Sequence, residues 1–298
     1  MTVQEHLPAG TILIVDSQAL GCSGAVFRVD PSTGEVGQFS LGGELLGGTG
    51  IAVEAGGGIL VSKDRHFPGT GSVLRLDPGT GHQSEVSSGG KFSAPLGVAV
   101  EAGGSILVAD GSAGGFGAVV RVDRTTGGQT VLSQGDGAGA DPPVRAVGLC
   151  VAPDGSVLVV EQNMIGGEDL SSRVVRVDPV TGARTTVTSG GDLRSPTDVV
   201  VDAAGRILVA DANAFPGFGG GVIRVDPVTG AQTTVSSGGG FVAPGAIAIE
   251  ADGSLLVTDS DPGGSDRTLF RVDPVTGAQK VLASGGQFTF LTGVAVVR

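Results

Sequence analysis

Four side chains in this sequence carry groups that can move a proton near neutral pH. Lys63 and His66 lie together in the stretch KDRHFPG, residues 63–69, whereas Glu161 and Asp198 are carboxylates in valine-rich segments. An imidazole, an amine and two carboxylates that face one partly desolvated pocket can act as general acids and bases. We take these four as candidate catalytic residues. The alternative, that each is solvated or held in a structural ion pair, stays open.

Large apolar side chains and two arginines fall in segments near these groups. The candidate substrate-binding residues are Phe67, Phe116, Arg145, Met164, Arg194, Phe215 and Phe218. Small-molecule sites are usually apolar mouths with a few polar groups, and an arginine can polarise a carbonyl. Some of these aromatic side chains can instead pack inside the fold, and that alternative also stays open.

A repeated phrase indicates which elements position these residues. RVDPVTG begins at 176, 224 and 271, and near-copies begin at 28, 75 and 121. The starts are 46 to 55 residues apart, and each interval holds four short β-branched runs, as at 96–102, 105–110, 117–123 and 129–134. Four strands per period of this length are typical of propeller blades. The sequence therefore predicts an all-β, six-bladed β-propeller, with four antiparallel strands per blade, as one domain over 1–298.

The two ends of the chain are out of phase with the blades. Calling the strands A to D from the channel outwards, residues 292–298 form a strand A with no strand B after it, and 11–17 form a strand B with no strand A before it. Pairing them completes one blade and closes the ring, which removes an exposed sheet edge. We therefore expect the C-terminal strand to complete the N-terminal blade, and we expect a monomer.

Some connections between strands have the same length in every repeat, and others vary in length. The A-to-B spacing and the repeated phrase, which is the C-to-D turn, keep fixed lengths, so these turns define a constant hairpin face. The B-to-C and D-to-A connections vary, and the longest of each, 161–173 and 133–148, belong to blade 4. Loops on a rigid scaffold concentrate binding residues. We predict that this loop face is functional, that blade 4 supplies a wall, and that the hairpin face is inert.

Recurrence separates structural residues from exceptions. Asp16, Asp110, Asp211 and Asp259 end strand B in four blades, and Phe92, Phe241 and Phe288 recur after Gly-Gly. We expect the aspartates to bond loop amides or the phrase arginine, and the phenylalanines to pack. Lys63 and Glu161 replace the aspartate in two blades, and Asp198 stands where other strands A have Gly or Ala. Cys150 is expected to be a small core residue.

Composition narrows the classes of partner. The net charge of -12 disfavours nucleic acid and anionic membranes, and Trp and Tyr are absent. No signal-peptide pattern opens the chain, so we expect a cytoplasmic protein. The two cysteines lack metal-ligand or disulfide spacing, and no phosphate-binding motif occurs, so no cofactor is expected.

The units GVAV, GSILVAD and VVRVD resemble NHL-type repeats, and the whole chain resembles six-bladed propellers of the gluconolactonase (senescence-marker), strictosidine synthase and streptogramin B lyase kind. The gluconolactonase resemblance implies a divalent metal held by Glu, Asn and Asp at the entry to strands A. The matching positions here are Thr49, Leu96, Val147, Thr197, Gly245 and Thr292, each with its following residue, and only Asp198 among them offers a carboxylate. The lyase-like members pair a His and a Glu with a metal, for which His66 and Glu161 are the nearest equivalents. We expect no metal site.

Three functions remain open on the sequence. The leading one is a metal-independent lyase, isomerase or cyclase that acts on a bulky, largely apolar small molecule, such as a natural product. The second is a propeller that binds a ligand or protein without catalysis. The third is a metal-dependent lactonase or other hydrolase. Fold resemblance does not decide among them.

Overall fold

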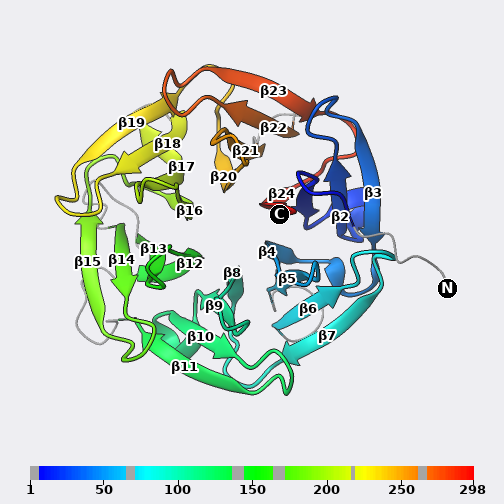
Figure 1. Cartoon of the computed structure of the whole chain (residues 1–298), viewed down its shortest axis with the longest axis horizontal. Helices are drawn as coiled ribbons and strands as arrows, with labels where there is room; N and C mark the ends of the chain where they lie inside the picture. Colours follow the sequence, from blue (N-terminus) through cyan, green and yellow to red (C-terminus); the bar gives the residue numbers. More distant parts are fainter. Residues whose placement is uncertain (1–6, 65–70, 136–143, 164–171, 216–218, 261–266) are drawn as a thin grey trace.

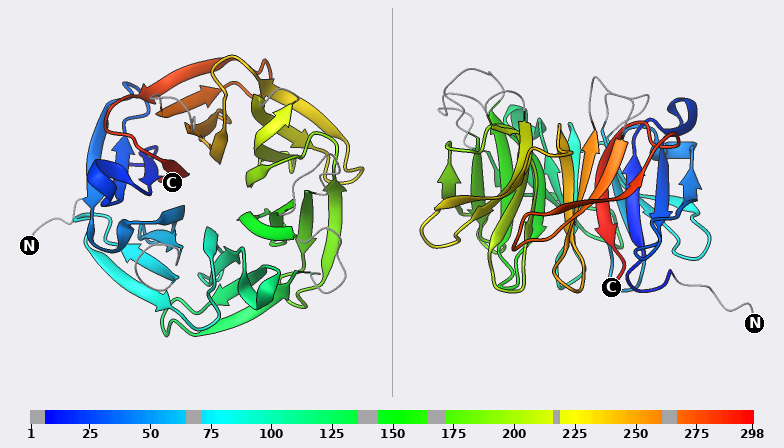
Figure 2. Two further views of the ribbon diagram at one scale, coloured as in Figure 1. Left: turned by 180° about the vertical axis from the view of Figure 1, so that it is seen from behind. Right: turned by 90° about the horizontal axis from the view of Figure 1, so that it is seen from above.

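The structure is a computed structural model that describes residues 7–64, 71–135, 144–163, 172–215, 219–260 and 267–298. Six four-stranded antiparallel sheets stand around a central channel as the blades of a propeller (Figure 1). The predicted fold class is confirmed. Within each blade the order from the channel outwards is A, B, C, D, and the second ribbon view shows the same ring from behind and edge-on (Figure 2).

The strands of blades 1 to 3 are as follows. Blade 1 contains β24 (Leu291–Val296), β1 (Ile12–Asp16), β2 (Ala25–Val29) and β3 (Val36–Leu41); blade 2 contains β4 (Gly48–Val53), β5 (Ile59–Lys63), β6 (Ser72–Leu76) and β7 (Gln83–Ser88); blade 3 contains β8 (Pro95–Val100), β9 (Ile106–Asp110), β10 (Ala118–Val122) and β11 (Gln129–Gln134).

The strands of blades 4 to 6 follow the same order. Blade 4 contains β12 (Val144–Val151), β13 (Val157–Asn163), β14 (Arg173–Val177) and β15 (Arg184–Ser189); blade 5 contains β16 (Pro196–Val201), β17 (Ile207–Phe215), β18 (Gly219–Val225) and β19 (Gln232–Ser237); blade 6 contains β20 (Pro244–Ile249), β21 (Leu255–Ser260), β22 (Arg267–Val272) and β23 (Gln279–Ser284). Short helical turns span Ala19–Cys22 (α1), Gly43–Leu45 (η1) and Ala113–Gly115 (η2).

The hydrophobic core lies between blades. Each of six buried clusters takes its side chains mainly from two neighbouring blades, and strands B are buried along nearly their whole length. Phe92, Phe241 and Phe288 belong to these clusters, so their predicted packing role is confirmed. Burial of this apolar surface supplies the main driving force for assembling the ring. Within the described residues, no helix has the length and apolar character needed to cross a membrane.

The ring closes between the two ends of the chain. β24 pairs antiparallel with β1, with Ile14 opposite Val294, and the ladder continues beyond the strands through Val297 N–H to Thr11 O at 2.9 Å. In Figure 1 the red β24 lies beside the blue β1 at the channel. The predicted closure by the C-terminal strand is confirmed.

The repeated phrase makes contacts between neighbouring blades. In RVDPVTG of blade 4, the Asp178 carboxylate accepts the Val180 and Thr181 amides, and Gly182 has a φ of +71°. A Cβ at Gly182 would lie 2.0 Å from the Leu132 carbonyl oxygen of blade 3, so only glycine fits. The phrase arginine of blade 3, Arg121, pairs with Glu101 and donates to the Pro179 carbonyl of the next blade. The phrase therefore recurs because each blade must hold its neighbour.

Candidate functional site

Two cavities lie along the channel, one toward each face. The loop-face pocket has a volume of about 390 Å³ and is lined by residues of strands A and by residues next to the ends of strands B, such as Gln162 and Ser260. The hairpin-face cavity has a volume of about 690 Å³ and is lined by the opposite halves of strands A and by A-to-B turns. Only the loop-face pocket was expected from the sequence.

The two cavities adjoin at one ring of side chains. Both are lined by Ile51, Val98, Leu149, Asp198 and Val294, which come from five of the six strands A. Four of the five are apolar. Asp198 is therefore a carboxyl group at the floor of the loop-face pocket, among the apolar side chains where the two cavities adjoin.

Close packing of strands A explains why Asp198 stands out. A Cβ at Gly50 would lie 2.6 Å from the Leu96 carbonyl oxygen, and one at Gly97 would lie 3.0 Å from the Gly148 Cα. Strands at this separation leave little room for a side chain at this level, and the other five positions are glycine or, in blade 6, Ala246. Asp198 is accommodated because its neighbour is Gly148, where a Cβ would lie 2.8 Å from Asp198 Oδ1.

The Asp198 carboxyl group is held by two backbone amides. Oδ1 accepts its own following amide, Val199 N–H, at 2.9 Å, and Oδ2 accepts Ile247 N–H of blade 6 at 3.1 Å. The group is partly accessible from the channel but lies deep in the protein. Desolvation raises its pKa to about 7, and this effect outweighs the two amide bonds that lower the pKa. Protonated and ionised forms are thus both populated near neutral pH.

Blade 4 contributes a second charged group to the same pocket. β12 begins earlier than other strands A, and Val144 and Arg145 pair with Asn163 and Gln162 of β13. Arg145 lines the pocket and donates to Gln162 Oε1 from Nε at 3.0 Å and from Nη2 at 2.7 Å. Gln162 also lines the pocket and is 9% exposed, and its Nε2 donates to Ser195 Oγ at 3.0 Å. The predicted blade 4 wall therefore includes these two residues.

Lys63 is not among the residues that line the pocket. It is 3% exposed, and its Nζ lies 2.5 Å from Glu44 Oε2 in the short helical turn η1. Glu44 belongs to the D-to-A connection that enters blade 2. Lys63 thus holds this connection through a charge pair, whereas the aspartates of other blades hold theirs through amides.

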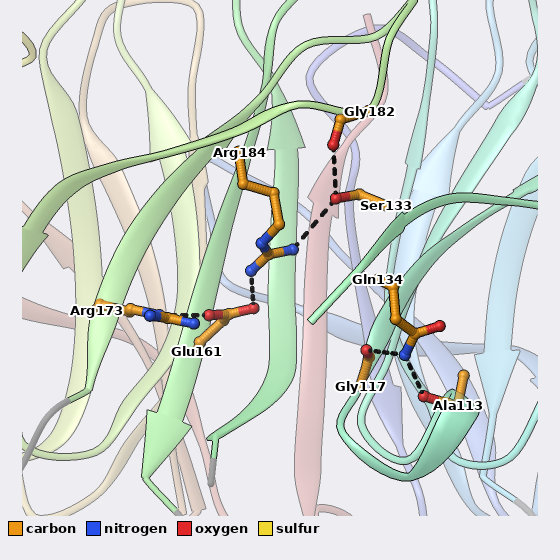
Figure 3. A network of polar contacts seen from close by, with 8 residues as sticks. All are labelled: Ala113, Gly117, Ser133, Gln134, Glu161, Arg173, Gly182 and Arg184. Carbon is orange, nitrogen blue, oxygen red and sulfur yellow. Dashed lines mark hydrogen bonds and ion pairs between the residues drawn. The ribbon is translucent and has the colours of Figure 1, made fainter. Parts of the chain in front are cut away.

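Glu161 also lies outside the pocket lining, in a network of ion pairs at the blade 3–blade 4 interface (Figure 3). Its side chain is 2% exposed and binds Arg173 Nε at 2.6 Å and the Arg184 guanidinium. Arg184 also donates to Ser133 Oγ of blade 3. In blade 4 the residues before the usual start of strand A, Val144 and Arg145, belong to β12 and pair with β13. This segment therefore needs no aspartate to accept its backbone amides. Glu161 is therefore available to pair with two partly buried arginines.

The aspartates that end strand B cap the neighbouring connections, as predicted. Asp110 accepts four backbone amides, those of Ser93, Ala94, Ser112 and Ala113, at 2.7 to 3.0 Å. Of the two partners predicted for these aspartates, the structure selects the loop amides. Three phrase arginines, Arg75, Arg121 and Arg271, bind glutamates of the A-to-B turns, which are Glu54, Glu101 and Glu250 respectively.

The other predicted site residues are dispersed. Phe116 is 37% exposed and lies outside the pocket lining, Phe215 packs against the blade 4–blade 5 cluster, and Arg194 is exposed and does not line the pocket. His66, Phe67, Met164 and Phe218 lie outside the described residues. Of the predicted site residues that the structure describes, only Asp198 and Arg145 line the loop-face pocket.

Sequence reasoning missed several lining residues. Gln162, Ala212 and Ser260 each follow the acidic residue of their repeat, which is Glu161, Asp211 or Asp259, and all three line the pocket. Their shared position in the repeat was a usable signal, because in blades 4, 5 and 6 the residue directly after this acid faces the mouth. Cys150 lines the hairpin-face cavity, and burial and the nearby Asp198 raise the pKa of its thiol, which makes a reactive thiolate unfavourable.

The residues at the strand A entries do not fit a divalent metal. The Thr49 hydroxyl donates to the Leu96 carbonyl at 2.9 Å, that of Thr197 to the Pro244 carbonyl at 3.0 Å, and that of Thr292 to the Gly48 carbonyl at 2.9 Å. Asp198 is then the one carboxylate at these positions, and hard cations require several oxygen ligands. No group of three or more His, Cys, Asp or Glu side chains with metal-binding geometry occurs in the described part of the chain.

Comparisons with known proteins agree with this architecture. No protein-family model matches the chain, and no curated protein matches it in sequence. Among solved structures, one of a nidogen/laminin complex superposes with a TM-score of 0.72 at 13% identity, covering 95% of this chain and 97% of that one. TolB from Acinetobacter baumannii gives 0.67 at 15% identity, over 95% of this chain and 67% of that one.

A periplasmic gluconolactonase of Pseudomonas aeruginosa is also similar, with a TM-score of 0.63 at 17% identity, covering 98% of this chain and 99% of that one. Such identities establish a shared fold and leave the activity open. The chain is a six-bladed β-propeller, similar in fold to the propellers in the solved structures of a gluconolactonase and of a nidogen/laminin complex.

Proposed function

We propose that this protein binds a small, largely apolar molecule in the loop-face pocket and catalyses a proton transfer of the lyase, isomerase or cyclase kind, with Asp198 as the acid–base group. The observation that carries this proposal is the position of Asp198, a carboxyl group held by two amides at the floor of an apolar pocket.

The apolar substrate class follows from the pocket walls. Leu96, Val98, Val147 and Leu149 line one side, and the cavity volume of about 390 Å³ lies within the range of small-molecule sites. On this side of the pocket a free sugar would find no hydrogen-bonding side chain among the four residues named. A planar or branched apolar molecule would displace water from them favourably.

The chemistry follows from the carboxyl group. With a pKa of about 7, Asp198 can accept a proton from a substrate C–H or O–H and return it to another atom of the same molecule. This sequence gives an isomer and needs no oxidant or reductant. In an elimination, the returned proton leaves with the departing group. For a cyclisation, the walls would add rate by holding one reactive conformer.

Lactone hydrolysis is the second candidate, because a gluconolactonase shares the fold. In that reaction Asp198 would take a proton from the attacking water. The strand A entries lack the ligands for a divalent metal, as described above, so a metal-assisted route would need residues beyond those described. The third candidate, binding without catalysis, uses the same pocket.

Solvent-exchange labelling tests the leading proposal. The purified protein is incubated with a small-molecule extract in D₂O, and mass spectrometry follows deuterium incorporation and the appearance of isomers or elimination products. We expect incorporation with the wild type and its loss by at least about a hundredfold with Asp198→Asn, the usual scale for removal of an acid–base group.

Lys63→Met is the matched control. Lys63 lies outside the pocket lining and its partner Glu44 is mostly exposed, so the variant should label like the wild type. Wild-type and Asp198→Asn proteins that retain a ligand equally well, with no labelling by either, would replace the proposal with the binding function. Hydrolysis of glucono-δ-lactone that Asp198→Asn abolishes, without deuterium incorporation, would favour the lactonase.

A further inference from the structure

The loop-face pocket has two charged side chains in its described lining, and they have opposite sign. Asp198 is at the floor, and Arg145 is contributed by the extended start of β12. No carboxylate within the described residues forms an ion pair with Arg145. The phrase arginines, by contrast, use nearby carboxylates, as in Arg75–Glu54 and Arg271–Glu250.

Arg145 is oriented by a neutral group. Gln162 Oε1 accepts from Nε and from Nη2, and buried Gln162 is fixed in turn by its bond to Ser195. A guanidinium has five N–H donors, so three remain for another partner. An amide acceptor fixes the plane of the guanidinium and leaves its full positive charge available. A carboxylate in the place of Gln162 would have neutralised it.

The two charged groups are within reach of one small ligand. Arg145 precedes Gly148 by three residues on β12, and Gly148 contacts Asp198. Three residues of strand advance the chain by ~10 Å, or less across the bulge between Ala146 and Gly148. A molecule of this length can bind Arg145 with one end and place its reacting atom at Asp198.

We infer that the substrate carries a carboxylate, which Arg145 binds at the pocket mouth, while its apolar body lies on the walls and its reacting end faces Asp198. This inference rests on the proposed function and names the substrate class. A monoanion suits the site because one guanidinium is present in the described lining and the protein's overall charge is -12. Guanidinium–carboxylate pairs are well matched because both groups are planar and can form two parallel hydrogen bonds.

A pair of probes that differ only in charge tests the inference. The probes are 4-phenylbutyrate and its amide, 4-phenylbutanamide, and their dissociation constants are measured by calorimetry on the intact protein. We expect the wild type to prefer the acid by about tenfold or more, the scale of a charge-assisted hydrogen bond. Arg145→Gln should reduce this preference to about twofold or less, and Arg145→Lys should give an intermediate value, since it keeps the charge and loses the paired geometry.

Arg194→Gln is the matched control, because Arg194 is an exposed arginine outside the pocket lining. It should keep the wild-type preference. Equal loss of preference in Arg194→Gln and Arg145→Gln would overturn the inference, since a general field effect of positive charge would then explain the result.

A pocket-filling variant separates failure of this inference from failure of the proposed function. Ala212 lines the pocket at the repeat position of Gln162, so Ala212→Phe should weaken both probes at least tenfold. Acid and amide that bind equally, with both blocked by Ala212→Phe, would overturn the carboxylate anchor and leave the pocket in place. Probes that fail to bind, or that bind regardless of Ala212→Phe, would overturn both.

Discussion

At the scale of single residues, one amino-acid type performs different tasks according to the partners that the fold provides. Asp110 caps a connection by accepting four amides, and Asp178 accepts two amides inside a turn. Asp198 accepts two amides as well, but it is desolvated where the two channel cavities adjoin. Its surroundings, rather than its bonding, make it the group suited to proton transfer.

The raised pKa of Asp198 makes a prediction about stability. Between about pH 3.8 and 7 the folded protein holds the Asp198 proton and the unfolded chain has lost it, so unfolding releases a proton and stability falls as the pH rises through this window. Above pH 7 the Asp198 carboxyl group is ionised in both the folded and the unfolded protein, so this group no longer makes stability change with pH. Asp198→Asn removes the titrating group, so its stability relative to the wild type should increase with pH.

The size of this effect is bounded by the shift. Three pKa units correspond to at most ~4 kcal/mol, and access of water through the channel reduces this to ~1–3 kcal/mol. Urea unfolding of both proteins at pH 4 and pH 8 measures it. Asp211, whose pKa desolvation raises to about 6, contributes the same slope to both proteins and cancels in the comparison. A difference that is independent of pH would contradict the assignment.

At the scale of elements, the fourth blade departs from the others as a unit. Its strand A starts earlier and pairs with the end of β13, which brings Arg145 and Gln162 to the pocket mouth. The same extension removes the need for a capping aspartate, and Glu161 takes its place. In blades 2, 3 and 6 a glutamine, such as Gln129, donates to a serine of the preceding blade. In blade 4 that position is Arg184, which bonds Ser133 and Glu161.

In blade 4, Glu161 stands in place of the aspartate of other blades and Arg184 in place of their glutamine, and we expect the contributions of these two residues to stability to be coupled. Glu161→Gln removes the carboxylate that pairs with Arg173 and Arg184 and should destabilise the protein by ~3 kcal/mol, the usual cost of breaking a buried pair. Adding Arg184→Gln should recover at least ~1 kcal/mol, the scale of one hydrogen bond, because the introduced glutamine can bond Ser133 as Gln129 bonds Ser87. The urea midpoints of the wild type, both single variants and the double variant give the coupling energy. Additive losses would show that the two positions are independent.

At the scale of the whole molecule, stability comes from six blade interfaces that close on themselves. Each interface buries its own cluster, and the interface of blades 6 and 1 depends on β24, whose Leu291 and Val294 join the cluster with Phe27 and Phe288. The loss of one strand therefore opens the ring and exposes apolar surface on two blades. This makes the propeller a cooperative unit, although each repeat contacts only its neighbours.

Removal of residues 291–298 should abolish folding. The truncated chain would lack β24 and would leave the inner edge of β1 unpaired, so it should aggregate or show no cooperative thermal transition by circular dichroism. A matched control is a circular permutant that joins the two ends and opens the exposed turn at Val180, which keeps every strand. The permutant should melt cooperatively. A soluble truncated protein with a cooperative transition would show that ring closure is dispensable.

The sequence alone determined the architecture, because the features that build a propeller are local and repeated. The phrase marks each C-to-D turn, the constant spacing marks strands A and B, and the out-of-phase ends indicate the closure. Asp110 and its counterparts were assigned a structural role because the repeat presents them in the same place each time. Asp198 and Arg145 were also found from the sequence, as departures from the repeat or as charges in a long connection.

Only the tertiary structure decided which departures share the pocket. Lys63 and Glu161 are exceptions to the pattern at the end of strand B, and Asp198 is an exception in strand A. Lys63 pairs with Glu44 of the connection that enters its blade, and Glu161 pairs with Arg184 on the outermost strand of its own blade, 23 residues further along the chain. Asp198 faces the channel because strand A lies innermost and Gly148 leaves room beside it. A side chain's direction and its nearest partner are set by packing between distant segments, and no periodicity within one segment contains that information.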